Sequence, residues 1–421
     1  MASKRLRWWI VWTLFGSTVI NYISRQTFSM VMPVLTQELH LSHTDLSRVL
    51  GVFQFSYAIM WLIGGVLLDV IGTRLGLALA VIWWSAVSMF NGLANSLFAF
   101  GAFRFLLGIG EGCNWPGASK TVAEWFPAKE RGVAVAIFDS GSSVGGAIAS
   151  VAVPFIALTF GWRYAFVLSG VLGFVWLGVW LRVYHPLDRH PRVTDEERAL
   201  IAAGRDTAAT SAQGGFGRWL DLLRQSNVWG IVLGRSLTDP IWWFYISWLP
   251  LYLSDARGFS LKRIAAFAWL PFVAADIGNF TGGLISSFLI KRGMPVIRAR
   301  KWVCVVSALP VLAGIPAATT HNAYWSLFLI AFAVWGYASW STMGLTFPSD
   351  LFPQDVVASV TGLSGFAASL AGTGFTLLVG WLVDKFSYTP AFFLAGTVPL
   401  VATACVLIFI HPAQRQTVLK S

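Results

Sequence analysis

Residues 46–95 read LSRVLGVFQFSYAIMWLIGGVLLDVIGTRLGLALAVIWWSAVSMFNGLAN, and they consist of two apolar segments, 46–69 and 76–95, joined by a short turn. A helix rises about 1.5 Å per residue, so about 20 apolar residues cross the hydrocarbon core of a bilayer, which is roughly 30 Å thick. Both segments reach that length. The stretch therefore predicts two membrane-crossing helices that meet at one surface of the membrane.

The composition extends this prediction to the whole chain. Of the 421 residues, 56% are hydrophobic and 12% are charged, and the mean hydropathy is +0.66. Soluble domains carry about 25% charged residues, so these values are typical of a membrane protein and leave no polar stretch long enough for a soluble catalytic domain. The three cysteines lie in apolar runs, which excludes a disulfide scaffold. Basic loops on one side of a membrane explain the net charge of +11, so we expect a lipid bilayer and no nucleic acid as partner.

Twelve apolar segments are predicted to form membrane-crossing helices. The first follows Met1 without a small-residue cleavage site, so we interpret it as a true crossing and not as a signal peptide. The segments lie near residues 8–33, 46–69, 76–95, 97–118, 133–157, 163–181, 228–253, 264–290, 301–318, 324–348, 356–382 and 388–410.

The Lys and Arg residues predict the orientation. With the N-terminus inside, 21 of the 30 fall on the cytoplasmic side and 6 fall outside, while Arg25, Arg104 and Arg235 lie within crossings. Positive charge is concentrated in the cytoplasmic loops of multi-pass proteins. We therefore expect a multi-pass protein of the cell (inner) membrane with both termini in the cytoplasm.

A polar stretch divides the chain into three parts. We expect an N-terminal six-helix bundle at 1–181, a cytoplasmic linker at 182–227 with a short helix from Thr194, and a C-terminal six-helix bundle with a short tail at 228–421. Similar residues recur in the two halves, such as Phe-Pro at 126–127 and again at 352–353. The predicted fold class is an all-α membrane protein with twelve transmembrane helices in two pseudo-symmetric halves, an architecture typical of transporters.

Ionisable residues within the crossings are the candidate functional residues, because a charge in hydrocarbon is costly. Arg25 lies about 25 Å from the cytoplasmic side and Arg104 about 10 Å from the outer side, so both reach the outer half of the membrane. Two buried guanidiniums repel each other unless an anion joins them, and a carboxylate fits their forked geometry. This predicts a binding site for a small carboxylate substrate. The alternative is that Arg104 pairs with an acid as an internal brace.

Glu111 and Asp139 are candidates for proton coupling. Glu111 follows Arg104 by seven residues on the same helix face. Loss of water favours its neutral form and a nearby arginine favours its charged form, so it could carry a proton. The alternative is a helix-packing hydrogen bond to the backbone. Asp139 begins a face of small polar residues and is equally a second titrating site or a partner of an arginine.

Other residues are assigned structural or stacking roles. Arg235 and Asp239 are four residues apart and are predicted to form a structural ion pair on one helix face. Asp69 and Arg74 bracket a glycine turn, which suits a conformational latch between helices, and Arg131 is grouped with them. Aromatic side chains that could stack on the face of a sugar are Tyr22, Tyr57 and Trp340.

The six histidines lie in predicted loops or at helix ends, at positions 40, 43, 185, 190, 321 and 411. Membrane acyltransferases, haem proteins and intramembrane metalloenzymes need histidine at depth. We therefore expect no catalytic residue, no metal site and no enzyme activity.

Six segments of the chain are typical of one family. They are Asn21-Tyr-Ile-Ser-Arg25-Gln, Asp69-Val-Ile-Gly-Thr-Arg74, Arg104-Phe-Leu-Leu-Gly-Ile-Gly-Glu111, Glu124-Trp-Phe-Pro-Ala-Lys-Glu-Arg131, Phe138-Asp-Ser-Gly-Ser-Ser143 and Phe267-Ala-Trp-Leu-Pro271. On these segments the chain resembles the major facilitator superfamily over nearly its whole length. Within that superfamily it looks like the anion:cation symporter family, nearest to bacterial hexuronate and galactonate transporters.

The resemblance implies proton-driven uptake of sugar acids. It implies that Arg25 and Tyr57 contact the substrate and that Ser364 faces the cavity. It also implies that Arg104 and Glu111 link substrate binding to proton binding.

Two positions depart from the family pattern. Ser24 stands where the family usually has an acid before the first-helix arginine, and Asp139 stands where hexuronate carriers often have asparagine. We therefore hypothesise that Asp139 replaces the missing acid and shares proton coupling with Glu111. The alternative is that only Glu111 titrates, with a changed stoichiometry or uniport.

Together these observations predict a proton-coupled symporter for a sugar-acid anion, either a hexuronate such as galacturonate or glucuronate or an aldonate, that works by alternating access. The proton is the coupling ion, no other cofactor is expected, and the protein is expected to act as a monomer. Alternatives are a transporter of another organic anion, such as a phthalate-like aromatic carboxylate, and a drug–proton antiporter. A membrane sensor would need an output module, for which the linker and the tail are too short.

Overall fold

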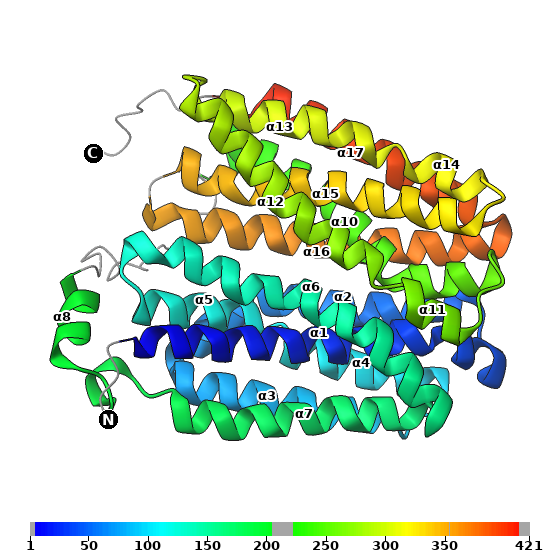
Figure 1. Ribbon diagram of the computed structural model, residues 1–421, viewed down its shortest axis with the longest axis horizontal. Helices are drawn as coiled ribbons and strands as arrows, with labels where there is room; N and C mark the ends of the chain where they lie inside the picture. Colours follow the sequence, from blue (N-terminus) through cyan, green and yellow to red (C-terminus); the bar gives the residue numbers. More distant parts are fainter. Residues whose placement is uncertain (1–4, 204–221, 353, 412–421) are drawn as a thin grey trace. The chain divides into compact units, whose positions relative to one another are not determined.

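The computed structural model describes residues 5–203, 222–352 and 354–411. These residues are almost entirely helical (Figure 1). The elements are α1 (Leu6–Leu39), α2 (His43–Ile71), α3 (Thr73–Asn91), α4 (Leu97–Glu111), α5 (Asn114–Trp125), α6 (Ala128–Thr159), α7 (Trp162–Val183), η1 (Leu187–Arg189), α8 (Asp195–Ala203), α10 (Ser226–Asp255), α11 (Leu261–Phe267), α12 (Leu270–Lys291), α13 (Val296–Val311), α14 (Gly314–Thr319), α15 (Ala323–Leu351), α16 (Gln354–Lys385) and α17 (Tyr388–Phe409).

Each of the twelve predicted segments coincides with a helix, and the fourth, eighth and ninth are each broken into two. They divide into α4 and α5, α11 and α12, and α13 and α14. In each case a proline stands in the first turn of the second helix, at Pro116, Pro271 and Pro316. Proline is well tolerated in the first turn of a helix, because the N–H that it lacks would be unpaired there, so these positions suit the start of a new helix.

Within the described ranges, nine helical stretches are long and apolar enough to cross a membrane. The predicted crossings that are not among them are the first, fourth and seventh, which comprise α1, α4 with α5, and α10. These same helices carry the buried residues Arg25, Arg104 and Arg235. Polar side chains lower the hydropathy of these helices and are tolerated at membrane depth only where the protein surrounds them.

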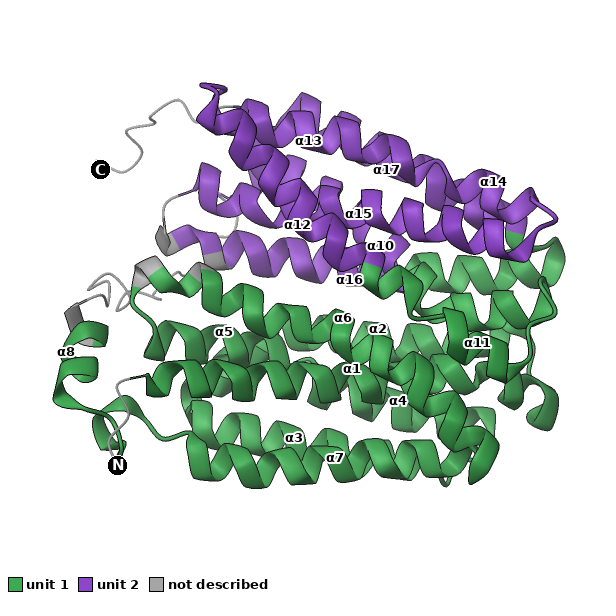
Figure 2. Ribbon diagram, in the orientation of Figure 1, with its two compact units in different colours: residues 1–207, 244–273, 373–388 green, residues 208–243, 274–372, 389–421 purple. Residues whose placement is uncertain are grey.

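The structure forms two compact units (Figure 2). Unit 1 contains the first half of the chain and two short stretches of the second half, Phe244–Val273 and Thr373–Tyr388. Unit 2 contains most of the second half. The two units are defined by which helices pack together and not by order along the chain, so they do not test the predicted division at 182–227, which stays a prediction. Part of that linker, 204–221, lies outside the described residues.

In unit 1, glycines let helices approach closely. Helix α1 packs along α6, and α2 packs along α4. A Cβ atom at Gly141 of α6 would lie 2.7 Å from the carbonyl oxygen of Phe15, and one at Gly108 of α4 would lie 2.6 Å from that of Phe53. Such spaces admit a hydrogen atom and no methyl group, so these glycines set the spacing of the helices around the interior of unit 1.

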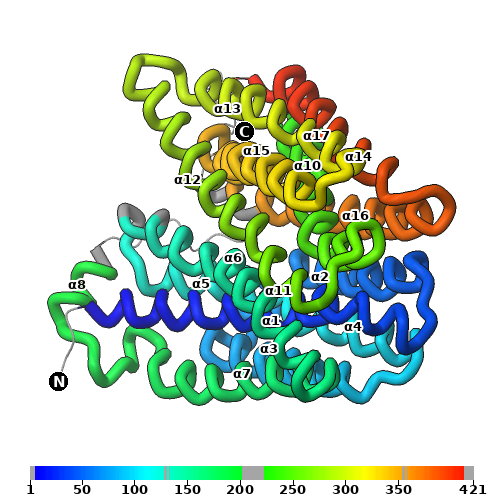
Figure 3. The backbone as a smooth tube through the Cα atoms, turned by 45° about the vertical axis from the view of Figure 1, so that its right-hand side comes forward, coloured from blue at the N-terminus to red at the C-terminus, as the bar shows by residue number. Residues whose placement is uncertain are grey.

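The first part of the linker is anchored on the start of α1 (Figure 3). Helix α8 begins beside Thr194, whose Oγ1 accepts a hydrogen bond from the N–H of Glu197 at 3.2 Å. The Glu197 carboxylate pairs with the Arg7 guanidinium at 2.8 Å, and Arg7 also pairs with Glu130 of α6 at 2.8 Å. The short helix predicted from Thr194 is confirmed, and its ion pair ties it to the first half of the chain.

Unit 2 is built around α15. Helices α13 and α14 pack along it. Gly282 of α12 also faces it, since a Cβ atom there would lie 2.7 Å from the Ser339 carbonyl oxygen. Trp340, Met343 and Phe347 of α15 are buried in the core of the unit. Arg300 of α13 pairs with Asp350 at the end of α15, at 3.0 Å.

Candidate functional site

The candidate site in unit 1 is centred on Arg25, in the middle of α1. The residue is 5% exposed, and its Nε atom lies 3.2 Å from Oε2 of Glu111 on α4. Its Nη2 atom donates a hydrogen bond to Oδ1 of Asn21, one turn earlier on α1, at 3.2 Å. Arg25 is therefore held by an ion pair to a second helix and by a hydrogen bond within its own helix.

Aromatic rings surround the Arg25 guanidinium. Its Cζ atom lies 4.5 Å from the ring centroid of Tyr57, 4.8 Å from that of Tyr22 and 5.3 Å from that of Phe53. Cations are attracted to aromatic faces, and the attraction is larger where water is excluded. The structure thus brings together three residues that the sequence predicted for substrate binding: Arg25, Tyr22 and Tyr57.

Arg104 of α4 is completely buried beside Arg25. Its two Nη atoms donate to the carbonyl oxygen of Arg25 at 3.4 and 3.5 Å, which are long distances for hydrogen bonds. Its Cζ atom lies 4.4 Å from the ring centroid of Phe28. Its Nε atom is buried with no hydrogen-bond partner in the described part of the chain. A buried guanidinium with such weak partners is costly, so it favours an additional anionic partner.

Glu111 forms its ion pair with Arg25. The Oε1 atom of Glu111 is also buried, and no described residue bonds to it. Two guanidiniums and one carboxylate leave a net positive charge when Glu111 is ionised. The cluster can therefore accept a further negative charge, and it can also accept a proton on Glu111.

Ser24 and Asp139, where the sequence departs from the family pattern, lie on α1 and α6. Ser24 is buried and donates a hydrogen bond to Oγ of Ser88 at 3.2 Å. Asp139 is half-buried, on the part of α6 that packs along α1. Gly145, six residues further along α6, would bring a Cβ atom within 2.9 Å of the Cβ of Tyr22. The coupling role of Asp139 stays a prediction.

Unit 2 contains a second buried polar cluster. Arg235 and Asp239 of α10 form an ion pair at 2.9 Å, four residues apart on one face, as the sequence predicted. Arg235 also donates from Nη1 to Oγ of Ser364 on α16, at 3.0 Å. A predicted structural pair and a predicted substrate residue are therefore in contact. Trp340 is buried and donates from its indole N–H to Thr403 at 2.9 Å, so its predicted stacking on substrate stays untested.

The predicted latch residues have other contacts in this structure. Asp69 pairs with Lys120 of α5 at 2.6 Å. Arg74 donates to the carbonyl oxygen of Leu181, and Arg131 donates to that of Phe126. A latch that joins Asp69, Arg74 and Arg131 stays a prediction.

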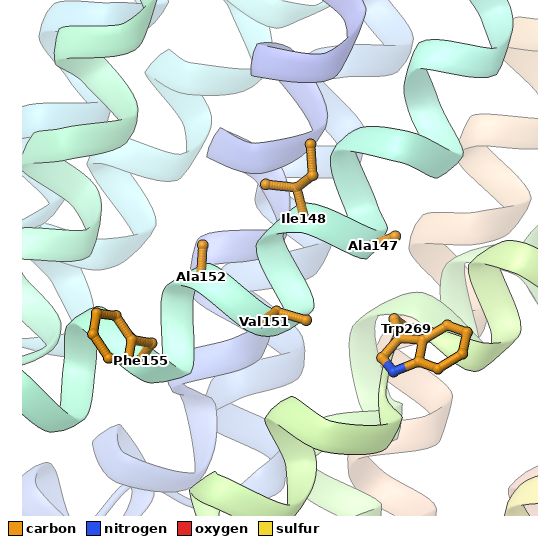
Figure 4. Close-up of a pocket in the computed structure, with 6 residues that line it drawn as sticks. All are labelled: Ala147, Ile148, Val151, Ala152, Phe155 and Trp269. Carbon is orange, nitrogen blue, oxygen red and sulfur yellow. The ribbon is translucent and has the colours of Figure 1, made fainter.

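A surface cavity of about 630 Å³ on unit 1 is of a different kind (Figure 4). Its lining consists of Ala147, Ile148, Val151, Ala152, Phe155 and Trp269. The single nitrogen among these side chains, that of Trp269, already donates to the carbonyl oxygen of Ala266. A polar solute would find no partner there, so the cavity suits a lipid chain and is not a candidate substrate site.

One polar cluster was missed in the sequence analysis. The imidazole of His43, the first residue of α2, lies between the carboxylates of Asp255 and Asp384. These partners are 212 and 341 residues away in sequence, so no local spacing could have indicated them. The signal in the sequence was a histidine three residues before the second apolar segment.

The comparisons with known proteins agree with this architecture. A sequence model of the Major Facilitator Superfamily matches residues 14–376. The chain is 34% identical to the hexuronate transporter of Escherichia coli (strain K12) over 395 residues, which cover 92% of this chain and 90% of the relative. It is 35% identical to the galacturonate transporter of Dickeya chrysanthemi over 308 residues, which cover 73% and 89%. It is 31% identical to the probable L-galactonate transporter of Escherichia coli (strain K12), with 97% and 90% covered.

Solved structures support the fold. A D-xylose-proton symporter superposes with a TM-score of 0.72 at 20% identity, covering 97% of this chain and 99% of that one. A bacterial homolog of the human lysosomal transporter Spinster gives a TM-score of 0.72 at 18% identity, with 96% of each chain covered.

These helices and relatives define a multi-pass membrane protein of the transporter class and not an enzyme. The chain belongs to the Major Facilitator Superfamily, and the resemblance stated from its motifs is confirmed.

Proposed function

We propose that this protein is a proton-coupled symporter that takes up a small sugar-acid anion, a hexuronate or an aldonate. Its curated relatives at 29–35% identity carry the names of hexuronate, galacturonate, galactarate and galactonate transporters. The observation that carries the proposal is the Arg25–Glu111 ion pair beside the poorly bonded Arg104. This cluster binds an anion and a proton in the same buried volume.

The charges of the cluster couple the two ligands. With Glu111 ionised, Arg25 is already neutralised and attracts an anion weakly. A proton on Glu111 removes that competition, so both guanidiniums become available to a carboxylate. By linkage, a bound carboxylate raises the proton affinity of Glu111 by the same factor by which the proton raises the affinity for the carboxylate. Couplings of this kind are typically about 1–3 kcal/mol. Because the charges of the anion and the proton cancel, the site has the same net charge when both are bound as when neither is bound.

The carboxylate end and the hydroxyl end of a sugar acid need different partners. The guanidiniums of Arg25 and Arg104 suit the carboxylate, because forked donors match its two oxygens. Tyr22 and Tyr57 suit the carbon backbone and hydroxyls of the sugar, because each ring combines an apolar face with a polar end. Transport proceeds by alternating access, with the protein in the inner membrane and both termini in the cytoplasm.

The test is uptake by the purified full-length protein in proteoliposomes. Labelled glucuronate, galacturonate, galactonate, xylose and a phthalate are offered with and without an inward proton gradient. We expect a sugar acid to accumulate, several-fold more with the gradient than without it, and neutral xylose to be excluded. Accumulation of the aromatic acid alone would overturn the substrate class. Equal uptake with and without the gradient would overturn the coupling.

A further inference from the structure

His43 bridges three helices at the end of unit 1 where α2 begins. Its Nδ1 atom lies 2.8 Å from Oδ1 of Asp384 on α16, and its Nε2 atom lies 2.9 Å from Oδ2 of Asp255 at the end of α10. Figure 2 shows the ends of α10 and α16 coloured with the first half of the chain. The imidazole therefore joins the first half of the chain to two helices of the second half.

The two distances indicate which form of histidine this arrangement needs. A neutral imidazole has one N–H group and one acceptor nitrogen, whereas an ionised carboxylate only accepts. Both ring nitrogens of His43 face carboxylate oxygens at hydrogen-bond distance. Only the protonated ring donates to both Asp255 and Asp384. Without that proton, one nitrogen lone pair would face a carboxylate oxygen.

Asp384 also caps helix α2. Its carboxylate accepts hydrogen bonds from the backbone N–H of His43 at 3.1 Å and of Thr44 at 2.7 Å, and from the Thr44 hydroxyl at 2.5 Å. Free N–H groups at a helix start favour a negative charge. Asp384 is therefore stabilised as a carboxylate. From α16 it adds acceptors for the first N–H groups of α2, beside the capping box that Ser42 and Asp45 form within the chain itself.

The other groups around His43 do not replace its charge. The ring centroids of Tyr388 and His43 lie 5.9 Å apart in a T-shaped arrangement, and Tyr388 donates its hydroxyl to Asp255 at 3.1 Å. Behind it, Arg257 donates to the hydroxyl of Tyr252 at 2.7 Å.

Charged neighbours along the chain complete the surroundings. On α2 itself, Asp45 pairs with the exposed Arg48 at 3.2 Å. On α16, Lys385 directly follows Asp384 and is exposed. Among the groups whose contacts the structure gives, His43 is the one cation that contacts both carboxylates.

Below this cluster, α16 runs along the first turns of α2. A Cβ atom at Gly380 would lie 2.7 Å from the carbonyl oxygen of His43, and one at Gly51 would lie 3.2 Å from the side chain of Leu377. Thr376 is buried and donates to Oε1 of Gln54 at 3.0 Å. Opening this end would separate these contacts and expose Thr376.

We propose that His43, Asp255 and Asp384 form a second proton-binding site, separate from Glu111, whose protonated form holds α10 and α16 against α2. Loss of the proton weakens both ion pairs and lets this end open. The proposal rests on the proposed function in one respect: the orientation predicted from Lys and Arg places this end outside. High outer acidity then slows the opening that uptake requires.

The test measures how readily a cysteine in place of Thr376 reacts with a membrane-impermeant maleimide between pH 5.5 and pH 8.5. No substrate is added, and the reaction of the parent protein, with its native cysteines, is subtracted. A cysteine at exposed Leu93, in the turn after α3 at the same end, reports how the reagent itself responds to pH. Relative to that reference, we expect labelling at 376 to be about three- to tenfold faster at pH 8.5 than at pH 5.5, because both ion pairs are partly exposed and each is therefore weak.

Variants separate a proton site from a merely structural contact. In His43→Asn, labelling should be fast at every pH, and in His43→Arg, which keeps the positive charge, it should be slow at every pH. Asp255→Asn should keep the pH dependence but move its midpoint to lower pH, because the ring loses one anionic partner. The matched control His40→Asn changes an exposed histidine at the end of α1 and should leave the profile of the parent unchanged.

Two results would overturn the proposal: an unchanged pH profile in His43→Asn, or the same profile in His43→Arg and His43→Asn. Because the labelling needs no substrate, its outcome is independent of the uptake panel. A chain that transported no sugar acid would fail the proposed function and could still pass this test.

Discussion

The Nε atom of Arg25 lies 3.2 Å from Oε2 of Glu111, so the buried arginine of α1 is neutralised by the buried acid of α4. Arg104, on the same helix as Glu111, is left with long hydrogen bonds to a backbone carbonyl and with an aromatic ring. With one acid and two arginines in the cluster, an anion can bind to the arginines while a proton binds to the acid. The first two predictions follow from it.

Arg25→Lys should reduce substrate affinity by about tenfold or more, because a charge-assisted hydrogen bond is worth about 1.5–3 kcal/mol. An ammonium group has no planar fork, so it cannot hold Asn21, Glu111 and a carboxylate in one plane. Affinity is measured by competition binding in detergent. Arg163→Lys, at a half-exposed ion pair with Glu38, serves as the control and should bind normally. Near-normal affinity in Arg25→Lys would refute a bidentate role.

Glu111→Gln should abolish accumulation driven by a proton gradient and preserve exchange of substrate across the membrane. The amide of glutamine cannot release a proton. It is uncharged, as protonated Glu111 is, so it leaves Arg25 available to the anion. Counterflow with labelled substrate on one side and unlabelled substrate on the other measures the exchange. Retention of gradient-driven accumulation would show that the coupling proton binds elsewhere.

Asp139→Asn tests whether this residue replaces the acid that is missing at position 24. If Asp139 shares coupling with Glu111, proton influx per substrate, followed with a pH dye inside the liposomes, should fall while substrate exchange continues. Because Asp139 is half-buried and lies on the part of α6 that packs along α1, folding is checked by thermal unfolding. Intact proton flux would leave Glu111 as the single coupling residue.

Gly108→Ala should destabilise the protein by about 1–3 kcal/mol, because the added methyl group would collide with the Phe53 carbonyl and with the Ser56 hydroxyl on α2. Gly101, two turns earlier on α4, is the matched control, since a Cβ atom there meets nothing within 4 Å. Gly101→Ala should be neutral or stabilising by roughly 0.5–1 kcal/mol, as alanine favours a helix. The midpoint of thermal unfolding in detergent measures both, and equal shifts would contradict the packing argument.

Much of the architecture could be predicted because it depends on local hydropathy. All twelve apolar segments coincide with helices, and the three that divide do so ahead of Pro116, Pro271 and Pro316. Proline alone would not have located these breaks, because Pro33, Pro154 and Pro399 lie inside helices that continue. Arg25, Arg104 and Glu111 could be chosen as candidates because charge within such a run is costly wherever it occurs.

The pairing of these charges could not be predicted in the same way. The sequence suggested an anion between Arg25 and Arg104, or a brace between Arg104 and an acid, whereas Glu111 pairs with Arg25 across 86 residues. Asp69 contacts Lys120 and not Arg74, and His43 contacts two aspartates from the far half of the chain. By contrast, Arg235 and Asp239 are one helical turn apart, and their pairing was predictable from spacing alone.

The order of apolar and polar residues was enough to predict which parts of the chain become helices and that Arg25, Arg104 and Glu111 are buried in them, because the cost of exposing a polar group to hydrocarbon acts on each segment separately. Packing of distant helices decided the rest. It brings Glu111 to Arg25, Ser364 to Arg235, and two carboxylates to His43. Coulomb attraction and hydrogen bonding act over a few ångströms in space, so they depend on which helix faces meet and not on distance along the chain.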